Sequence, residues 1–403
     1  MDNLELTNQT VLVRVDFNVP LSPKGKILDD YRLKAHLPTI EYLLKKNAKI
    51  VLLAHLGRPR GRVVSDLSLN KLVPTLTKLL GRDVTFVPDC IGRMAEQTVL
   101  KAPPGSILLM ENLRFYKEEV ENDKNFIRKL AYLGGAYVND AFATCHRPHA
   151  SIIGLPSLLP SAAGLLLTEE LTRLDHMLNT PERPLTMIIG GAKLARKMEV
   201  LSHAIFKANQ VIVGGAVANT LLAAKDVDVG RSLIEPDYIE SMRDLLVEAG
   251  IVGCRILLPQ DAVVAHMLQE NLPSITKKIN QLEMGDMILD VGPQTLKVWS
   301  RVLQKSKSII WNGPVGAYEI SPYDEGTHNL ANAIVHSDAK TLAAGRDTLT
   351  ALRKCKLRHK FDSISTAGAA FLDTLADREL RGVKALKEAQ GRRVGDSSSR
   401  KPA

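Results

Sequence analysis

Short apolar segments that alternate with amphipathic stretches are the feature that most restricts the fold of this chain. In the first half the segments are "TVLVRVDFNVP", "KIVLLAHLGRP", "SILLMENLRF" and "GAYVNDAFATCHRPH", and a second series runs from "LTMIIGGAK" to "SISTAGAA". Helical stretches such as "RLKAHLPTIEYLLKKN" lie between them. Strands that alternate with helices predict a parallel sheet with helices on both faces, and strands that are apolar throughout predict burial on both sides.

The length of 403 residues suggests more than one domain. The stretch "TEELTRLDHMLNTPERP" predicts a helix that ends at an Asn-Thr-Pro break before the next strand. We therefore expect an α/β chain with two doubly wound, parallel-sheet (Rossmann-like) lobes, residues 1–167 and 185–370, joined by a hinge helix in residues 168–184. The polar, basic residues 387–403 predict a disordered tail.

Composition restricts the class of partner. A net charge of +9 fits an anionic small substrate, nucleic acid, or solubility alone. Aromatic residues make up only 4%, which disfavours stacking on single-stranded nucleic acid. Neither a basic, apolar N-terminal signal nor an apolar run of the roughly 20 residues that span a membrane is present. The four cysteines form no C-x-x-C pair, which disfavours a zinc site and fits a cytoplasmic protein.

Arginines follow several strands of the first half. The carboxyl ends of parallel strands meet at one edge of a sheet, where ligands bind. Arginine forms a rigid fork that matches a carboxylate or phosphate, so a shared anion site is one interpretation and ordinary surface ion pairs are the other. Asp16 and Asn18 could bind hydroxyl groups beside that site, or serve only the turn. The residues concerned are Arg32, His55, Arg58, Arg114 and Arg147.

Glycine-rich turns mark the second half. In "GGAKLARKM", Gly190 and Gly191 precede Lys193 and Lys197, whose spacing of four predicts one shared helix face. Two cations at a helix N-terminus suggest a phosphate ligand, although two solvated lysines would give the same pattern. No G-x-x-x-x-G-K-[ST] motif and no protein-kinase motif set occurs.

Two further turns extend this second site. "WNGPVGAYE" would let backbone approach a flat ligand and would place Glu319 to accept from ribose hydroxyls, or it is a plain turn. "KTLAAGRDTLTALRK" predicts a strand, a tight turn and a helix, which is a typical phosphate-binding arrangement, yet Arg346 stands where glycine would be the easy choice. No paired metal ligands are visible, so any metal is expected to be Mg²⁺ carried with phosphates and bound by Asp347.

Together these segments resemble the phosphoglycerate kinase family. "VLVRVDFNVPL", "AHLGRPRG", "LLMENLRFYKEE", "NDAFATCHRPHAS", "GGAKLARKM" and "WNGPVGAYE" match that family's signatures in order, and the resemblance covers roughly Leu4 to Leu386. It implies a monomeric, cytoplasmic glycolytic enzyme of two lobes, with no nucleic-acid or membrane partner. It also implies that residues 371–386 return to the first lobe.

The resemblance also assigns roles by motif. The 3-phosphoglycerate residues would be Asp16, Phe17, Asn18, Arg32, His55, Leu56, Gly57, Arg58, Arg114 and Arg147. The nucleotide residues would be Gly191, Lys197, Gly215, Asn312, Pro314, Glu319, Gly345, Arg346, Asp347 and Thr348, with Mg²⁺ on Asp347 and ATP or ADP as co-substrate. Arg32, Lys193 and Lys197 would be catalytic, flanking or contacting the transferred phosphoryl group.

The chain departs from the family pattern in the second lobe. The usual Gly-Gly-Gly-Asp-Thr reads Ala344 to Thr348 here, and the turn "STAGAA" has Ala369 where glycine is usual. The closing segment carries Ala376, Asp377 and Arg381 where glutamate, glycine and proline are typical, and Arg196 in the lysine motif stands where Asp, Ser or Thr is commoner. Two hypotheses follow: an active kinase, or a non-catalytic binding or scaffold protein that keeps the fold and a 3-phosphoglycerate pocket but binds nucleotide poorly. If position 346 requires positive φ, a bulky residue there is strained. A kinase for another small acid should have altered the arginines, which are intact.

Overall fold

The computed structural model describes residue 1 and residues 4–398, except the side chains of residues 393–398. The chain divides into two compact units, one formed by Met1–Thr172 with Glu379–Ala403 and the other by Arg173–Arg378. No helix within the described part of the chain is both long and apolar enough to cross a lipid bilayer.

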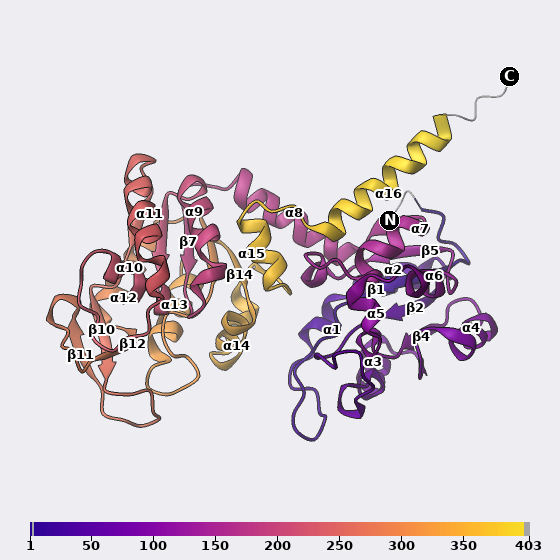
Figure 1. Ribbon diagram of the computed structural model, residues 1–403, viewed down its shortest axis with the longest axis horizontal. Helices are drawn as coiled ribbons and strands as arrows, with labels where there is room; N and C mark the ends of the chain where they lie inside the picture. Colours follow the sequence, from indigo (N-terminus) through magenta and orange to yellow (C-terminus); the bar gives the residue numbers. More distant parts are fainter. Residues whose placement is uncertain (2–3, 399–403) are drawn as a thin grey trace. The chain divides into compact units, whose positions relative to one another are not determined.

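The first unit is built on a six-stranded sheet in the order β3-β4-β2-β1-β5-β6, and all of its pairings are parallel. Figure 1 labels four of these strands, β1, β2, β4 and β5. The order places β1 in the interior of the sheet, with polar residues following it and its neighbours at one edge. The strands are β1 Thr10–Arg14, β2 Lys49–Leu53, β3 Val84–Val87, β4 Ile107–Met110, β5 Ala136–Asn139 and β6 Ser161–Ala163.

Helices connect these strands. The stretch predicted as one helix is divided at His36, because Pro38 in the first turn of the second helix has no N–H for a continuous helix. The helices of this unit are α1 Tyr31–Ala35, α2 Leu37–Lys45, α3 Val73–Leu80, α4 Gly92–Lys101, α5 Lys117–Glu121, α6 Lys124–Ala131, α7 Leu155–Leu158 and α16 Arg381–Ser398.

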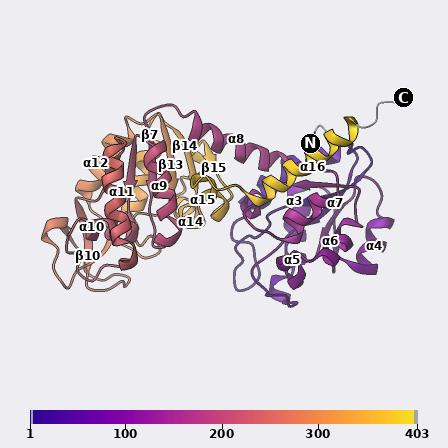
Figure 2. The ribbon, with the colours of Figure 1, turned by 45° about the horizontal axis from the view of Figure 1, so that its top comes forward.

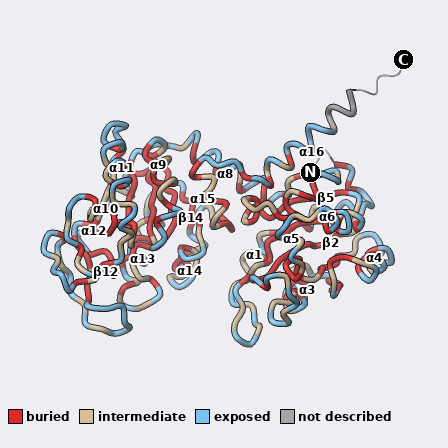
Figure 3. The backbone as a smooth tube through the Cα atoms, in the orientation of Figure 1, coloured by how far each residue is buried: buried red, intermediate tan, exposed pale blue. Residues whose placement is uncertain are grey.

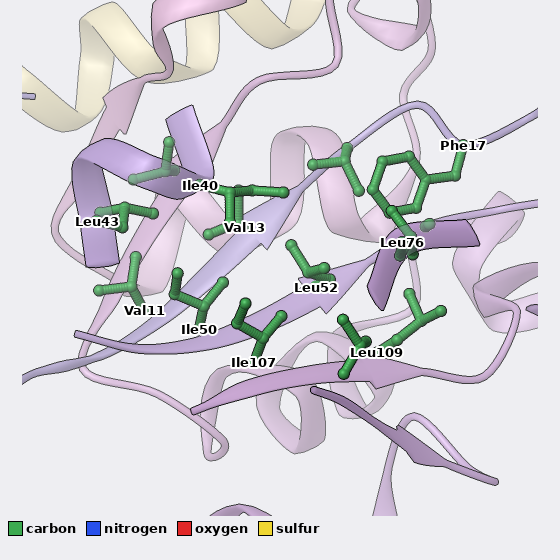
Figure 4. Close-up of a cluster of buried hydrophobic side chains, with 14 of the residues drawn as sticks. Val11, Val13, Phe17, Ile40, Leu43, Ile50, Leu52, Leu76, Ile107 and Leu109 are labelled. Carbon is green, nitrogen blue, oxygen red and sulfur yellow. The ribbon is translucent and has the colours of Figure 1, made fainter. Parts of the chain in front are cut away.

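The core of the first unit shows why these segments form strands. Alternate residues of β1, β2 and β4, such as Val13, Leu52 and Leu109, point into one cluster with Ile40 of α2 and Leu76 of α3 (Figure 4). The intervening residues, Leu12, Val51 and Leu108, are also buried. Burial on both faces is the expected property of a parallel sheet between helical layers.

The second unit contains another six-stranded parallel sheet, in the order β15-β14-β13-β7-β8-β9. The predicted α/β class with parallel sheets is therefore confirmed. Buried residues follow the strands of both units (Figure 3). The strands here are β7 Leu185–Ile189, β8 Gln210–Val213, β9 Arg255–Leu257, β13 Ser308–Asn312, β14 Lys340–Ala344 and β15 Ser363–Ile364.

One face of this second sheet packs against α12, α13 and α14 through residues such as Trp299, Leu330 and Leu352. The remaining helices include α9 and α11, which lie side by side (Figure 2). The helices are α9 Met198–Lys207, α10 Gly215–Ala224, α11 Ile239–Ile251, α12 Pro293–Leu303, α13 Glu325–Val335, α14 Arg346–Lys354 and α15 Ala369–Leu375.

The second unit also contains a small antiparallel sheet, which the apolar segments did not predict. Its order is β11-β10-β12, with strands Ile275–Lys278, Asp261–Ala265 and Met287–Val291. The segment "RILLPQDAVVA" supplies strands to both sheets of the unit, since β9 and β10 are separated by Leu258, Pro259 and Gln260. An apolar segment indicates burial but carries no information on the direction of its partner strand.

The helix predicted at the domain boundary is α8, Leu165–Asn179, and the division between the units falls within it. Its role as a hinge remains a prediction, as do the functions assigned to each lobe. Disorder from residue 387 is wrong for the described part of the tail. Helix α16 continues to Ser398, Leu386 and Ala389 are buried, and Arg392 donates to the carbonyl of Pro156 at 2.7 Å. The rest of that prediction, residues 399–403, lies outside the described residues.

Candidate active site

In the first unit, the residues assigned to 3-phosphoglycerate follow strands β1, β2, β4 and β5. Asp16 lies just beyond β1, and its Oδ2 accepts from Arg32 Nη1 of α1 at 2.5 Å. Asn18 accepts from the backbone N–H of Gly57 at 2.9 Å through its side-chain oxygen. Gly57 has φ +64°, and a side chain there would meet Leu67. The β1 and β2 ends are therefore joined by short polar contacts.

Arg14 is a residue of this network that the motifs alone did not single out as a ligand. It is the last residue of β1, it is fully buried, and its Nη2 lies 3.1 Å from Nδ1 of His55, beyond β2. Burial, followed by Arg14 and Arg114, lowers the pKa of His55 well below its ordinary value. The imidazole is thus neutral, and its Nδ1 accepts from Arg14. The available signal was a charged residue inside an otherwise apolar parallel strand.

Arg114 is the best indication that the cluster binds an anion. It follows β4, it is 9% exposed, and its Nη1 donates to the carbonyl of Gly57 at 2.9 Å. Its Nε is buried and has no hydrogen-bond partner among the described residues. Burial, then Arg14 and Arg147, lower the pKa of Arg114 to about 10, so these cations lie near one another. A buried unsatisfied donor among like charges is the environment that a bound anion would relieve.

The two remaining arginines differ in setting. Arg147, after β5, is half-buried and lowers the pKa of Arg114, so the structure brings it to the cluster. Arg58 is exposed, and within the part of the chain that the structure describes no hydrogen bond or ion pair joins its side chain to the cluster. Phe17 and Leu56 are buried in the hydrophobic core, which gives them a packing role beside the site.

A buried carboxyl group, that of Glu119, is linked to the arginine cluster through Ser151. Ser151 Oγ accepts from Arg14 Nε at 2.9 Å and donates to Glu119 Oε1 at 2.6 Å. Glu119 also accepts from the backbone N–H of Ser151. Burial, then the cations Arg114 and Arg14, lower the pKa of His149 to about 3. Glu119 ends the segment "LLMENLRFYKEE", and His149 and Ser151 lie in "NDAFATCHRPHAS", but only the tertiary structure shows that their side chains pack beneath the arginines.

In the second unit, glycines let the ends of β7, β8 and β13 approach one another. A Cβ on Gly190 would lie 2.1 Å from the carbonyl oxygen of Pro314, and a Cβ on Gly215 would lie 2.8 Å from the backbone nitrogen of Gly191. Gly191 and Gly215 have φ of +92° and +63°. A side chain at Gly190 or Gly215 would separate the strand ends, whereas at Gly191 it is the positive φ that favours glycine.

Lys193 and Lys197 do not share a helix face, contrary to prediction. Lys193 has an extended backbone and precedes a 3₁₀ turn, Leu194–Arg196, whereas Lys197 lies at the start of α9. The reason is the short turn, which breaks the α-helical spacing on which the prediction depended. Lys193 is exposed and Lys197 is buried, so the two lysines occupy different environments.

Lys197 is held by carbonyl groups at the ends of β7 and β13. Its Nζ donates to the side-chain oxygen of Asn312 at 3.0 Å, to the Asn312 carbonyl at 3.1 Å, and to the carbonyl of Gly190. Burial lowers the pKa of Lys197 to about 7, although the Asp347 carboxylate acts in the opposite direction. A phosphate group near Nζ would favour the charged form.

The turn between β14 and α14 has its strained backbone at a glycine. Gly345 has φ +98°, whereas Arg346 is the first residue of α14 and is not among the residues with positive φ. The Arg346 side chain is 88% exposed, and its Nε lies 3.4 Å from Oδ1 of Asp347. Thr348 Oγ1 accepts from the backbone N–H of Gly313 at 2.7 Å, which ties α14 to the end of β13. Arg346 is therefore an unstrained extra cation at a helix N-terminus.

A cavity of about 440 Å³ lies beside these turns. It contacts several predicted nucleotide residues, including Gly191, Gly215, Pro314, Glu319 and Asp347, and its apolar wall includes Leu233 and Met287. Tyr318 also lines it, and burial followed by the Asp347 carboxylate raises the pKa of this tyrosine. An apolar cavity with a few polar groups at one end is the typical form of a site for a small flat ligand.

Two further departures have distinct backbone settings. Ala369 opens α15 in an ordinary helical position, so no glycine is required there. Asp377, by contrast, has φ +54°, in the left-handed region that glycine adopts most easily. Aspartate tolerates this region better than most residues, which explains how the turn survives the replacement.

Comparison with known proteins gives one family throughout. The family model described as phosphoglycerate kinase matches residues 1–378. Curated relatives named phosphoglycerate kinase include that of Moorella thermoacetica, 42% identical with 96% of this chain and 98% of the relative covered, and that of Ruegeria, 44% identical with the same coverage. The solved phosphoglycerate kinase structure from Coxiella burnetii superposes with a TM-score of 0.85 at 35% identity, covering 96% of this chain and 98% of the other. The structure from Pyrococcus horikoshii also has a TM-score of 0.85, at 30% identity, with 97% and 99% covered. The chain belongs to the phosphoglycerate kinase family and is a phosphotransferase.

Proposed function

We propose that this chain uses the cluster around Arg32 and Arg114 to bind 3-phosphoglycerate, and the turns around Lys197 and Gly345 to bind magnesium ADP or ATP. The chemistry is the reversible transfer of a phosphoryl group between 1,3-bisphosphoglycerate and ADP. The assignment of the acid site depends on Nε of Arg114, which is buried among like charges at one sheet edge and has no hydrogen-bond partner among the described residues.

The nucleotide site fits a phosphate chain with Mg²⁺. Gly345 precedes α14, so backbone N–H groups and the helix dipole are available to phosphate oxygens. No group of three or more His, Cys, Asp or Glu side chains that could hold a metal occurs among the described residues. Mg²⁺ commonly takes one or two carboxylates and completes its shell with phosphates and water, so Asp347 is sufficient as the protein ligand.

In the direction of ATP use, a carboxylate oxygen of 3-phosphoglycerate forms a bond to the γ-phosphorus, and the bond from that phosphorus to the β–γ bridging oxygen breaks. ADP leaves with the electron pair. No general base is required, because the attacking oxygen is already ionised. The chain's task is alignment and charge neutralisation, with Arg32 on the acid side and Lys193 and Lys197 on the nucleotide side. Mg²⁺ would neutralise charge on the phosphate oxygens.

The acid and the nucleotide bind in different units in this proposal, so transfer requires the two half-sites to meet. Exclusion of water at that moment would prevent loss of the phosphoryl group to hydrolysis. We also propose that the enzyme acts in the cytoplasm as a monomer, with small molecules as its partners. The non-catalytic alternative depended on a strained residue 346, and the helical setting of Arg346 removes that support.

A coupled assay tests the proposal. Purified protein is supplied with 3-phosphoglycerate, Mg²⁺ and ATP, and formation of 1,3-bisphosphoglycerate is followed through its reduction. We expect turnover that falls at least a hundredfold in Lys193→Ala, since that side chain is exposed and its removal leaves the fold intact. Turnover equal to that of the variant would contradict the catalytic assignment, and calorimetry with 3-phosphoglycerate and with ADP would then show which half-site fails.

A further inference from the structure

A buried hydrogen-bonded chain leads from the acid half-site to the start of α8. The backbone N–H of Asp16 donates to Nε2 of His36 at 2.9 Å. Nδ1 of the same ring lies 2.6 Å from Oδ2 of Asp140, which follows β5. His36 and Asp140 are fully buried, and Asp16 is 1% exposed. A path of polar groups this well sequestered from water is costly unless every member is paired, as these are.

The donors define the tautomer of His36. A backbone N–H can only donate, so Nε2 must be the acceptor and Nδ1 must carry the proton given to Asp140. Phe17 packs against the ring in an edge-on arrangement, with centroids 5.7 Å apart. The imidazole is therefore neutral, fixed at both nitrogens, and held in orientation by a neighbour of Asp16. Its two nitrogens therefore contact two different parts of the first unit, Asp16 after β1 and Asp140 after β5.

Asp140 provides the cap of α8. Its Oδ1 accepts from the backbone N–H groups of Leu166 and Leu167 at 3.0 and 3.4 Å. These belong to the first-turn donors that a helix cannot satisfy internally. Gly164 allows the approach, since a Cβ there would lie 2.0 Å from Oδ1 of Asp140. Thr39 accepts from Leu165 at 2.9 Å, giving a second cap that does not involve Asp16.

Helix α8 is where the two units share one element. Its residues up to Thr172 belong to the first unit, and those from Arg173 belong to the second. The helix that begins at this first turn therefore continues into the unit with the nucleotide turns. At the other end of this series of hydrogen bonds, the Asp16 carboxylate accepts from Arg32, which the proposed function places in contact with the substrate.

We propose that His36 is a positioning residue that transmits occupancy of the acid half-site, through Asp16 and Asp140, to the first turn of α8. This inference rests on the proposed function, because it takes 3-phosphoglycerate as the ligand that shifts Asp16 and Arg32. His36 contacts no substrate itself. Its effect is on the coupling between acid binding and the second unit.

The chain contains a built-in reporter. Its two tryptophans, Trp299 and Trp311, both belong to the second unit, whereas the acid site belongs to the first. Titration with 3-phosphoglycerate in the absence of nucleotide is expected to change tryptophan emission in the wild-type chain. The variants are His36→Gln, which can keep an acceptor for Asp16, and His36→Asn, which can keep a donor for Asp140. Thr39→Val is the matched control, because it removes a hydrogen bond to the first turn of α8 and leaves the hydrogen bonds between Asp16, His36 and Asp140 in place.

We expect both His36 variants to bind 3-phosphoglycerate within about threefold of wild type by calorimetry, to lose the emission change, and to lose at least tenfold in kcat with KM for ATP unchanged. Thr39→Val should retain the emission change and kcat. Three results would overturn the proposed role of His36. They are a normal emission change in either His36 variant, loss of the emission change in Thr39→Val, and no emission change in the wild-type chain. A wild-type chain that neither binds 3-phosphoglycerate nor turns over would instead refute the proposed function.

Nitrogen-15 spectroscopy of histidine covers the case in which the His36 variants do not fold. In the wild-type chain His36 should show a protonated Nδ1 and an unprotonated Nε2, and its signals should shift on saturation with 3-phosphoglycerate. A His36 ring protonated at Nε2, or signals unmoved by saturating 3-phosphoglycerate, would overturn the inference without any substitution.

Discussion

Replacing Arg346 with glycine is expected to weaken phosphate binding by the loop between β14 and α14, although it restores the family's usual residue. The positive φ of this loop, +98°, is at Gly345, which the chain retains. Arg346 is the first residue of α14 and its side chain is 88% exposed. The substitution therefore relieves no backbone strain and removes one cation from the edge of the proposed phosphate site.

The magnitudes follow from that setting. Glycine in place of arginine destabilises the helix by about 0.5–1 kcal/mol because of its lower helix propensity. Removing a cation from the helix N-terminus stabilises the helix by about 0.3–1 kcal/mol. The two effects oppose each other, so the free energy of unfolding should change by less than about 1 kcal/mol. Loss of an exposed charge near a phosphate should cost about 0.5–1 kcal/mol of binding, or roughly two- to fivefold in Kd for ADP. That loss should shrink at high salt, because exposed charges are screened.

Two matched substitutions sharpen the comparison. Asp377→Gly also restores a typical glycine, but there the backbone has φ +54°, so a gain of about 0.5–1 kcal/mol in stability is expected. Gly345→Ala places a Cβ 2.8 Å from Nδ2 of Asn312, which donates to Ala344. Strain in that region of φ and ψ costs about 1–3 kcal/mol, and loss of the hydrogen bond costs about 1 kcal/mol more.

Urea unfolding followed by tryptophan emission measures these effects in the second unit, which holds both tryptophans, and calorimetry gives the Kd for ADP at low and high salt. The expected order of stability is Asp377→Gly, wild type and Arg346→Gly close together, then Gly345→Ala. An Arg346→Gly variant that is more stable than wild type and binds ADP more tightly would refute the reasoning, since it would mean that position 346 needs glycine.

Three further predictions concern single side chains. Because burial lowers the pKa of Lys197 to about 7, ADP binding at pH 8 should take up a proton onto its amine, seen as a dependence of calorimetric heat on buffer ionisation, and Lys197→Met should abolish the dependence. Arg114→Ala should raise KM for 3-phosphoglycerate about a hundredfold or more with little change in ADP affinity, and an equal loss for both ligands would contradict its assignment to the acid site. Burial raises the pKa of Asp290 to about 8, above its unfolded value, so its contribution to stability is present below about pH 4 and is lost as pH rises toward 8. Stability measured from pH 5 to 8 should therefore fall less in Asp290→Asn than in wild type.

Much of the architecture follows from local pattern. Strands β1, β2, β7, β13 and β14 lie where apolar segments predicted them, and the break after Asn179 ends α8 as expected. These features depend on local composition, turn residues and proline, all of which can be read within a few residues. The antiparallel sheet could not be read in this way, because strand direction depends on a partner that is distant in sequence.

Within the candidate site, residue types and spacing were sufficient to nominate the arginines and glycine turns, and the sequence by itself determined the family. Only the tertiary structure decided that Lys197 is buried while Lys193 is exposed, and that Arg14 rests on Ser151 and Glu119. It also decided that the left-handed backbone falls on Gly345 and not on Arg346. Burial, charge proximity and φ are set by neighbours brought from other strands, so they are properties of the folded arrangement that a local pattern of residues does not contain.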